Sequence, residues 1–187
     1  MAAPGGTGPI GPYPTRVGDD PEAQDEYDKM RRRVLWTMPY GLYVLGSRAG
    51  ERRNLMTINW VTQVSFEPKL IAVGIEKPAL THELVAEGRV FVLNTVARED
   101  RAIVRRFTKP TEWDPGASTL NGFAVHEAST GAPVLDQAPA FLDCEVREAV
   151  ELGNHTLFVG EVVDAGFQGP EDVPVLRMED TRMNYGG

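Results

Sequence analysis

A single histidine, His155, stands in the stretch "LGNHTLFVGEVVDA", residues 152–165, which otherwise has the pattern of a β-strand. An imidazole donates, accepts or exchanges a proton near neutral pH, so this side chain is a candidate for chemistry. It could equally be a packed side chain held by a structural hydrogen bond. The residues alone leave both interpretations open.

Uncharged hydrogen-bonding side chains follow the segment "NLMTINWVTQVSF", residues 54–66. Alternate side chains of a strand share a face, so one face here would carry Leu55, Thr57, Asn59, Val61, Gln63 and Ser65. Solvated sheet faces usually include Lys or Glu, and this face has neither. The pattern fits either a groove for a polar ligand or an ordinary solvated face.

A lysine and a threonine flank the start of a short predicted helix in "EKPALTHEL", residues 76–84. A helix N-terminus presents free N–H groups and a partial positive charge, so Lys77 and Thr81 could complete a phosphate site. A plain helix cap beside a surface lysine would have the same pattern.

Several familiar active-site motifs are missing from the sequence, namely GxSxG, GxxxxGKS/T, HExxH and CxxC. The three histidines, His82, His126 and His155, lack the local spacing of metal ligands, so the sequence does not favour a metal site. The GxGxxG of residues 6–11 follows no apolar strand and is interrupted by proline, so no dinucleotide fingerprint is expected there.

The composition is that of one globular domain, with 42% hydrophobic and 25% charged residues among 187. A net charge of −8 argues against a nucleic-acid partner, because such proteins usually cluster Lys and Arg against phosphates. No apolar run is long enough to span a membrane and no signal-peptide core is present, so a cytoplasmic location with no membrane partner is expected. The lone cysteine, Cys144, is expected to fill the core.

The expected elements describe a β-rich domain behind a flexible arm. Residues 1–24 are rich in Gly, Pro and acid, which predicts the arm, and apolar residues at helical spacing over 27–38 predict a helix that ends at Pro39. Further helices are expected at 77–88 and 98–107. Seven β-rich runs predict a mostly antiparallel barrel, in residues 40–47, 54–66, 69–76, 89–96, 122–128, 140–152 and 155–167.

Residues 54–96 and 141–165 resemble the flavin reductase-like FMN-binding split-barrel family. The ordered motifs carry the resemblance: a Met-Thr strand, a Ser-x-x-Pro turn, an apolar strand, a Thr-initiated helix, a Phe-Val-Leu-Asn strand and a Gly-x-His strand. The resemblance implies a mainly β fold over residues 25–187, a six-stranded antiparallel Greek-key split β-barrel with flanking helices. It also implies a homodimer that binds FMN, or FAD in its place, near the subunit interface.

The resemblance assigns cofactor contacts residue by residue. The flavin ribityl chain and ring edge would follow Asn54, Met56, Thr57, Asn59, Trp60, Thr62, Gln63 and Ser65. These positions fall on both faces of a strand, so backbone groups or a bulge must supply some contacts. Lys77 and Thr81 would hold the phosphate, and Asn94 would lie near the ribityl chain or the ring edge.

The same resemblance implies a catalytic role for His155, which would position the nicotinamide of NAD(P)H, or a second flavin, beside the bound flavin. The family usually has an acidic or small residue before this histidine, whereas Asn154 stands here. The implied activity is that of a flavin reductase, which passes electrons to a small acceptor or a partner monooxygenase. Two alternatives stay open: a flavoredoxin-like electron carrier with a protein redox partner, and a flavin-binding module in which His155 is only packed.

Overall fold

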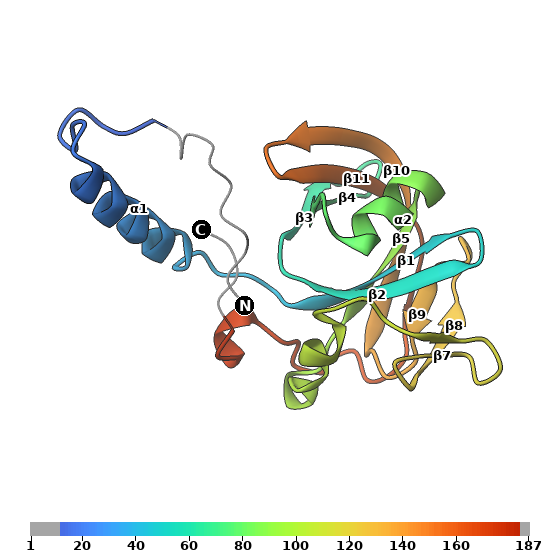
Figure 1. Ribbon diagram of the computed structural model, residues 1–187. Helices are drawn as coiled ribbons and strands as arrows, with labels where there is room; N and C mark the ends of the chain where they lie inside the picture. The colour runs from blue at the N-terminus through green and yellow to red at the C-terminus, as the bar shows by residue number, and fades with distance from the viewer. Residues whose placement is uncertain (1–11, 184–187) are drawn as a thin grey trace. The chain divides into compact units, whose positions relative to one another are not determined.

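The computed structural model describes residues 12–183, which divide into two compact units (Figure 1). The larger unit is Tyr40–Arg182, and the smaller contains the helix before it. Residues 1–11 of the predicted arm lie outside the described residues, and the boundary predicted between residues 24 and 25 stays a prediction.

Helix α1 (Pro21–Leu35) begins where the sequence supplies an N-cap. Asp20 accepts a hydrogen bond from the Ala23 N–H at 3.1 Å, and Pro21 occupies the first helical position, where its missing N–H costs nothing. The helix therefore starts inside the segment predicted as a flexible arm. Arg32 and Arg33 lie in its last turn, where they complement the helix dipole.

One antiparallel sheet of seven strands dominates the larger unit, in the order β2-β1-β5-β10-β11-β4-β3. Its strands are β1 (Tyr43–Ala49), β2 (Arg52–Ile58), β3 (Val61–Ser65), β4 (Leu70–Glu76), β5 (Val90–Thr95), β10 (Ala140–Leu152) and β11 (His155–Phe167).

The sheet is strongly curled, because its two edge strands are consecutive in the chain. Only Asn59 and Trp60 separate β2 from β3, and two residues span roughly 7 Å when extended. The edges therefore approach each other, although no β2–β3 pairing joins them within the described residues. The predicted count of six strands is not what the structure has, since the segment predicted as one strand over residues 54–66 divides at these two residues.

A second sheet of four short strands has the order β6-β7-β8-β9. Only the region of β8 was expected as a strand, because elements of two or three residues leave no periodicity to detect. The backbone of β1 lies so close to β9 that a Cβ on Gly46 would be 2.1 Å from the Pro133 carbonyl oxygen. The four strands are β6 (Trp113–Asp114), β7 (Thr119–Leu120), β8 (Phe123–Glu127) and β9 (Pro133–Leu135).

The core lies inside the curled sheet. Gly160 allows Phe91 to pack against β11, because a Cβ there would be 2.6 Å from the ring. Cys144 is fully buried, which confirms its expected place in the core. The buried cluster consists of Leu45, Ile58, Ile71, Val73, Ile75, Val85, Phe91, Leu93, Cys144, Val146 and Phe158.

Helix α2 (Leu80–Gly88) lies where a helix was predicted and packs against β1, β2 and β4. The helix expected over 98–107 is instead two short 3-10 helices, η1 (Arg98–Asp100) and η2 (Ile103–Phe107). Ile103 and Phe107, the apolar pair that predicted it, are both buried. The last such helix is η3 (Met178–Asp180).

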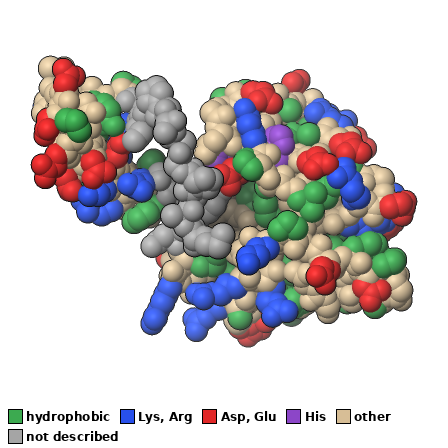
Figure 2. Space-filling view, viewed as in Figure 1, with side chains coloured by type: hydrophobic (Ala, Val, Ile, Leu, Met, Phe, Trp, Pro, Cys, Tyr) green, Lys and Arg blue, Asp and Glu red, His purple; other side chains and the backbone are tan. Residues whose placement is uncertain are grey.

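The surface of the larger unit mixes acidic and basic side chains on the face that Figure 2 shows. Arg52, for example, forms ion pairs with both Glu83 and Glu87 of α2, at 2.6 and 2.5 Å. Among residues 12–183, no helix is long and apolar enough to cross a membrane.

Candidate functional site

The junction between β2 and β3 places Trp60 over β4. The Gly74 N–H donates to the Trp60 carbonyl at 2.9 Å, which fixes the junction to the strand. A Cβ on Gly74 would lie 3.2 Å from Cε3 of the indole, so the glycine makes room for the ring. Trp60 is thereby held half-buried at the point where the sheet edges meet.

His155 reaches the same place from the other side of β4. It is the first residue of β11, it follows a tight turn in which Gly153 has a φ of 50°, and it pairs with Glu76 of β4. Its imidazole lies against the Trp60 indole, with ring centroids 4.5 Å apart and planes inclined by 43°. Two rings from distant parts of the sequence thus form one surface, which we call the Trp60–His155 pair.

Two buried polar atoms in this region are unsatisfied, one on His155 itself and one on Asn59, the residue before Trp60. Nδ1 of His155 lies 2.8 Å from Oδ1 of Asn154, but Nε2 has no partner within the described chain. The amide nitrogen of Asn59, a side chain only 3% exposed, likewise has no partner there. Buried polar groups are normally hydrogen-bonded, so Nε2 of His155 marks a place at the pair where a polar ligand would satisfy it.

Burial sets the charge state of the imidazole. Desolvation lowers the pKa of His155 below its usual value, and the nearby Glu76 carboxylate only partly opposes this shift. The ring is therefore neutral at neutral pH, with one nitrogen available to donate and the other to accept.

The predicted phosphate residues lie next to this site. Lys77 follows β4, its N–H donates to the Asn154 carbonyl at 2.9 Å, and its ammonium pairs with Glu151 at 2.5 Å. Lys77 also lowers the pKa of the Glu151 carboxyl. Because this ion pair is largely exposed, it is weak and can be exchanged for another anion.

Thr81 and Asn54 hold each other inside the fold. The Asn54 amide donates to Oγ1 of buried Thr81 at 2.8 Å, and its oxygen accepts from the N–H and hydroxyl of Thr111 at 2.8 and 2.9 Å. These bonds tie β2 to the start of α2 and to the segment before β6. The helix N-cap, Ala79, makes no side-chain cap of its own.

Asn94 and Thr57 are also engaged within the fold. The Asn94 amide donates to the Val44 carbonyl at 3.1 Å and accepts from the Leu135 N–H at 2.9 Å, which joins β1, β5 and β9. The Thr57 hydroxyl donates to the Val104 carbonyl at 2.5 Å. Neither side chain is brought to the Trp60–His155 pair by any of these bonds.

The remaining predicted contacts follow β2 and β3. Met56 packs against the core, whereas Thr62 and Gln63 are exposed on the edge strand. The Gln63 amide donates to the Ser65 carbonyl at 3.1 Å, and the pairing register shifts between these two residues. Residues of β3 thus follow the junction directly, and their contact with a flavin stays a prediction.

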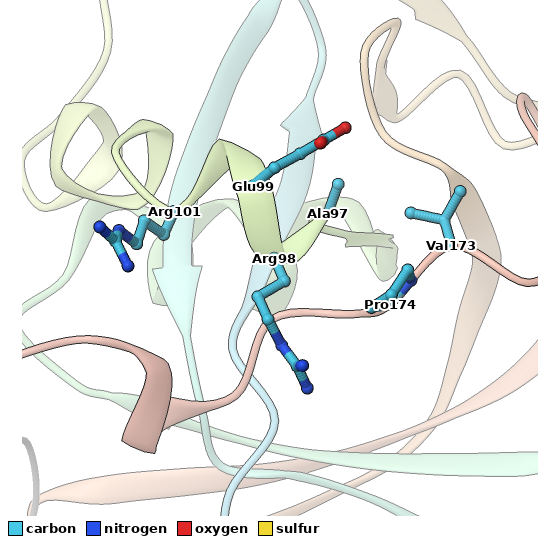
Figure 3. Close-up of a pocket in the computed structure, with 6 residues that line it drawn as sticks. All are labelled: Ala97, Arg98, Glu99, Arg101, Val173 and Pro174. Carbon is cyan, nitrogen blue, oxygen red and sulfur yellow. The ribbon is translucent and has the colours of Figure 1, made fainter.

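A separate pocket of about 570 Å³ lies at η1, and no predicted site residue lines it (Figure 3). Figure 3 shows the Arg98 and Arg101 side chains pointing in different directions from η1. Arg98 is tied to Asp180 at 3.2 Å. The lining residues are Ala97, Arg98, Glu99, Arg101, Val173 and Pro174.

A family comparison agrees with this geometry. A model described as "Flavin reductase like domain" matches residues 32–186. The chain belongs to this flavin reductase-like family. Membership supports a flavin-related oxidoreductase, and the curled antiparallel sheet fits the split barrel of its structural relatives.

A curated relative of this flavin reductase-like chain is the high molecular weight rubredoxin of Moorella thermoacetica, 34% identical over 140 residues. The match covers 73% of this chain but 59% of that protein, so the relative is considerably longer.

Two solved structures are similar over most of the chain. An NADH:FAD oxidoreductase of Streptomyces globisporus C-1027 has a TM-score of 0.70 at 25% identity, covering 82% of this chain and 88% of that one. An FMN-binding protein from Thermus thermophilus, with bound 1-cyclohex-2-enone, has a TM-score of 0.61 at 29% identity, covering 70% and 72%.

Sequence reasoning assigned no structural role to His82 and Gly74 of this flavin reductase-like domain. His82 of α2 lies with Nε2 2.7 Å from the Thr156 hydroxyl, next to His155 in the chain, and its ring contacts Phe158. Its position directly after Thr81 was the available signal. Nothing in the sequence indicated the role of Gly74, because Trp60 comes near it only when β3 pairs with β4.

Proposed function

We propose that the protein is an FMN-binding oxidoreductase that takes hydride from NAD(P)H and passes electrons to a small acceptor or a partner monooxygenase. The observation that carries the proposal is the Trp60–His155 pair with the unsatisfied Nε2 of His155, in a chain of the flavin reductase-like family. FAD is the alternative cofactor, since one structural relative is named for it.

The residues present fit a flavin. Nε2 of His155 offers an acceptor that a polar ring edge would satisfy, and the Asn59 amide, on the residue before Trp60, offers an unused donor. When bound, the flavin supplies the redox chemistry, accepting hydride and releasing electrons. The protein's part is to hold the reacting rings in contact, with Trp60 and His155 forming one wall.

Phosphate binding is proposed for Lys77 and the start of α2. Lys77 would exchange its exposed Glu151 partner for the phosphate, and the first N–H groups of α2 would add the helix dipole. Thr62, Gln63 and Ser65 would contact the flavin from the edge strand. The other predicted residues have side chains that bond or pack within the fold, and they would hold β2, β5 and α2 in place around the flavin. They are Asn54, Met56, Thr57, Thr81 and Asn94.

Two pairs of variants test the site. Trp60→Phe and His155→Ala are expected to weaken FMN binding at least several-fold in a fluorescence titration. Trp113→Phe and His126→Ala are the matched controls, because Trp113 stacks on Arg53 and His126 bonds Asp136 in the other sheet. Equal losses in both pairs would place the flavin elsewhere.

A flavoredoxin-like electron carrier is the second candidate. It is favoured by the curated relative, which is named a rubredoxin. A carrier would retain FMN and be reduced by a protein partner, but not by NADH or NADPH. Anaerobic addition of both nucleotides to the FMN-loaded protein separates the two functions.

A homodimer is proposed with β3 at its interface. Phe66 is 85% exposed and Val64 is 52% exposed, and large exposed apolar side chains that lie together mark interaction surfaces. Light scattering after size exclusion is expected to give a dimer that Phe66→Glu weakens. Val175→Glu, at an exposed apolar side chain outside β3, is the control.

A further inference from the structure

The turn before β11 holds an unusual pairing of neighbours. Oδ1 of Asn154 lies 2.8 Å from Nδ1 of His155. An amide oxygen only accepts hydrogen bonds, so Nδ1 must carry the proton in this contact. The neutral ring then has a lone pair on Nε2.

Burial favours the same tautomer. Nε2 is out of contact with solvent and has no partner in the described chain. A proton there would create a buried, unpaired N–H, which is rarer in proteins than an under-satisfied acceptor. The ring also lies against the Trp60 indole, whose N–H is a donor and not an acceptor.

We propose that Asn154 is a positioning residue, which holds His155 in the neutral Nδ1–H tautomer and so presents Nε2 as an acceptor for an N–H or O–H group of the bound ligand. The identity of that ligand as a flavin or nicotinamide rests on the proposed function. The tautomer itself does not, because it is a property of the protein without ligand.

The uncharged amide matters because the surrounding charges are few. Glu76, the partner of His155 on β4, is the charge that acts on its ring, whereas Lys77 and Glu151 act on the ring of His82. Lys77 and Glu151 pair with each other, which leaves Glu76 as the main charge that favours a protonated ring. A carboxylate in place of Asn154 would add a second negative charge in direct contact and would favour the imidazolium.

The experiment is a long-range ¹H–¹⁵N NMR spectrum of the histidine side chains in the flavin-free protein. His82→Gln, His126→Gln and His155→Gln assign the three rings. His126 is an internal reference, since its Nδ1 lies 2.7 Å from the Asp136 carboxylate. The proposal expects His155 to show a protonated Nδ1 and a bare Nε2 at neutral pH.

Two substitutions complete the test. Asn154→Ala removes the acceptor of the Nδ1 proton and is expected to raise the fraction of His155 that is protonated at Nε2, against the remaining effect of burial, while the other two rings are unchanged. Asn154→Asp is expected to raise the protonation midpoint of His155 by about one pH unit, because it adds a charge at contact distance. A wild-type ring protonated at Nε2, or a tautomer that Asn154→Ala does not change, would overturn the proposal.

The outcome separates this proposal from the proposed function. If the protein shows the predicted tautomer but binds no flavin, the proposed function is contradicted and the proposed role of Asn154 stands. If NAD(P)H reduces the bound flavin but His155 has the opposite tautomer, the proposed function stands and the role of Asn154 is contradicted.

Discussion

The indole of Trp60 and the imidazole of His155 meet at 4.5 Å because both are anchored to β4. Trp60 is held by the Gly74 N–H, and His155 pairs with Glu76 two residues further along the same strand. One strand thus sets the distance between two rings that come from opposite ends of the domain sequence. Changes in β4 should therefore alter the site without touching either ring.

Gly74→Ala tests this dependence. The new methyl group would lie 3.2 Å from the Trp60 ring, so the indole must move by a few tenths of an ångström relative to His155. We expect FMN binding to weaken several-fold and stability to fall by about 1–3 kcal/mol, as for other overpacked sites. Gly169→Ala is the control, since nothing lies within 4 Å of a Cβ there. Unchanged FMN affinity in Gly74→Ala would show that the pair does not contact the flavin.

Two buried asparagines should behave oppositely. Asn94→Ala leaves the Val44 carbonyl and the Leu135 N–H without partners, so we expect a loss of about 2 kcal/mol in unfolding free energy with little change in FMN affinity. Asn59→Ala removes a nitrogen that has no partner in the described chain. It should therefore lower the free energy of unfolding less than Asn94→Ala does, and weaken FMN binding more. Urea unfolding and FMN titration of both variants provide the measurement. The reverse pattern would support direct contact of Asn94 with the cofactor.

Stability should fall as the solution becomes acidic. Burial lowers the pKa of both His82 and His155 below the usual value for a histidine, so the unfolded chain binds more protons than the folded one as the solution becomes mildly acidic. Their contribution is present above the unfolded pKa and is lost as pH falls toward the folded one. Urea unfolding from about pH 7.5 to about pH 5.5 should show this decline, and His82→Gln should flatten it. If the free energy of unfolding does not change across this pH range, burial does not lower the pKa of these two histidines.

Cys144 should be inert in the folded protein. Burial raises the pKa of its thiol to about 12, so almost no thiolate exists at mildly alkaline pH. We expect a thiol reagent to label it only after unfolding by denaturant. Rapid labelling of the native protein would mean that the core around β10 opens readily.

The long elements could be predicted from local patterns, and the site only in part. Helix α2 and the strands β4, β10 and β11 have clear periodicity and turn residues at their ends. The break at Asn59 and Trp60 could not be predicted, because alternation of apolar and polar residues continues through it. The strand ends there because the chain passes from one edge of the sheet to the other. This passage depends on strand pairing between residues far apart in the sequence.

The candidate site shows the same division. His155 and Trp60 were identified from ordered motifs, but their contact depends on how both are anchored to β4. Thr81 was expected at a phosphate, yet its hydroxyl accepts from Asn54, a partner that only folding brings near. The sequence therefore identified the residue types, while strand pairing determined which of them share a surface.

The most direct measurement is anaerobic reduction of the FMN-loaded protein, followed through the visible absorbance of oxidised flavin. Wild type should retain FMN after desalting and bleach rapidly with NADH or NADPH, whereas His155→Ala should bleach much more slowly and His126→Ala at the wild-type rate. Retained flavin that neither nucleotide bleaches, or equal rates in all three proteins, would contradict a reductase built on the Trp60–His155 pair.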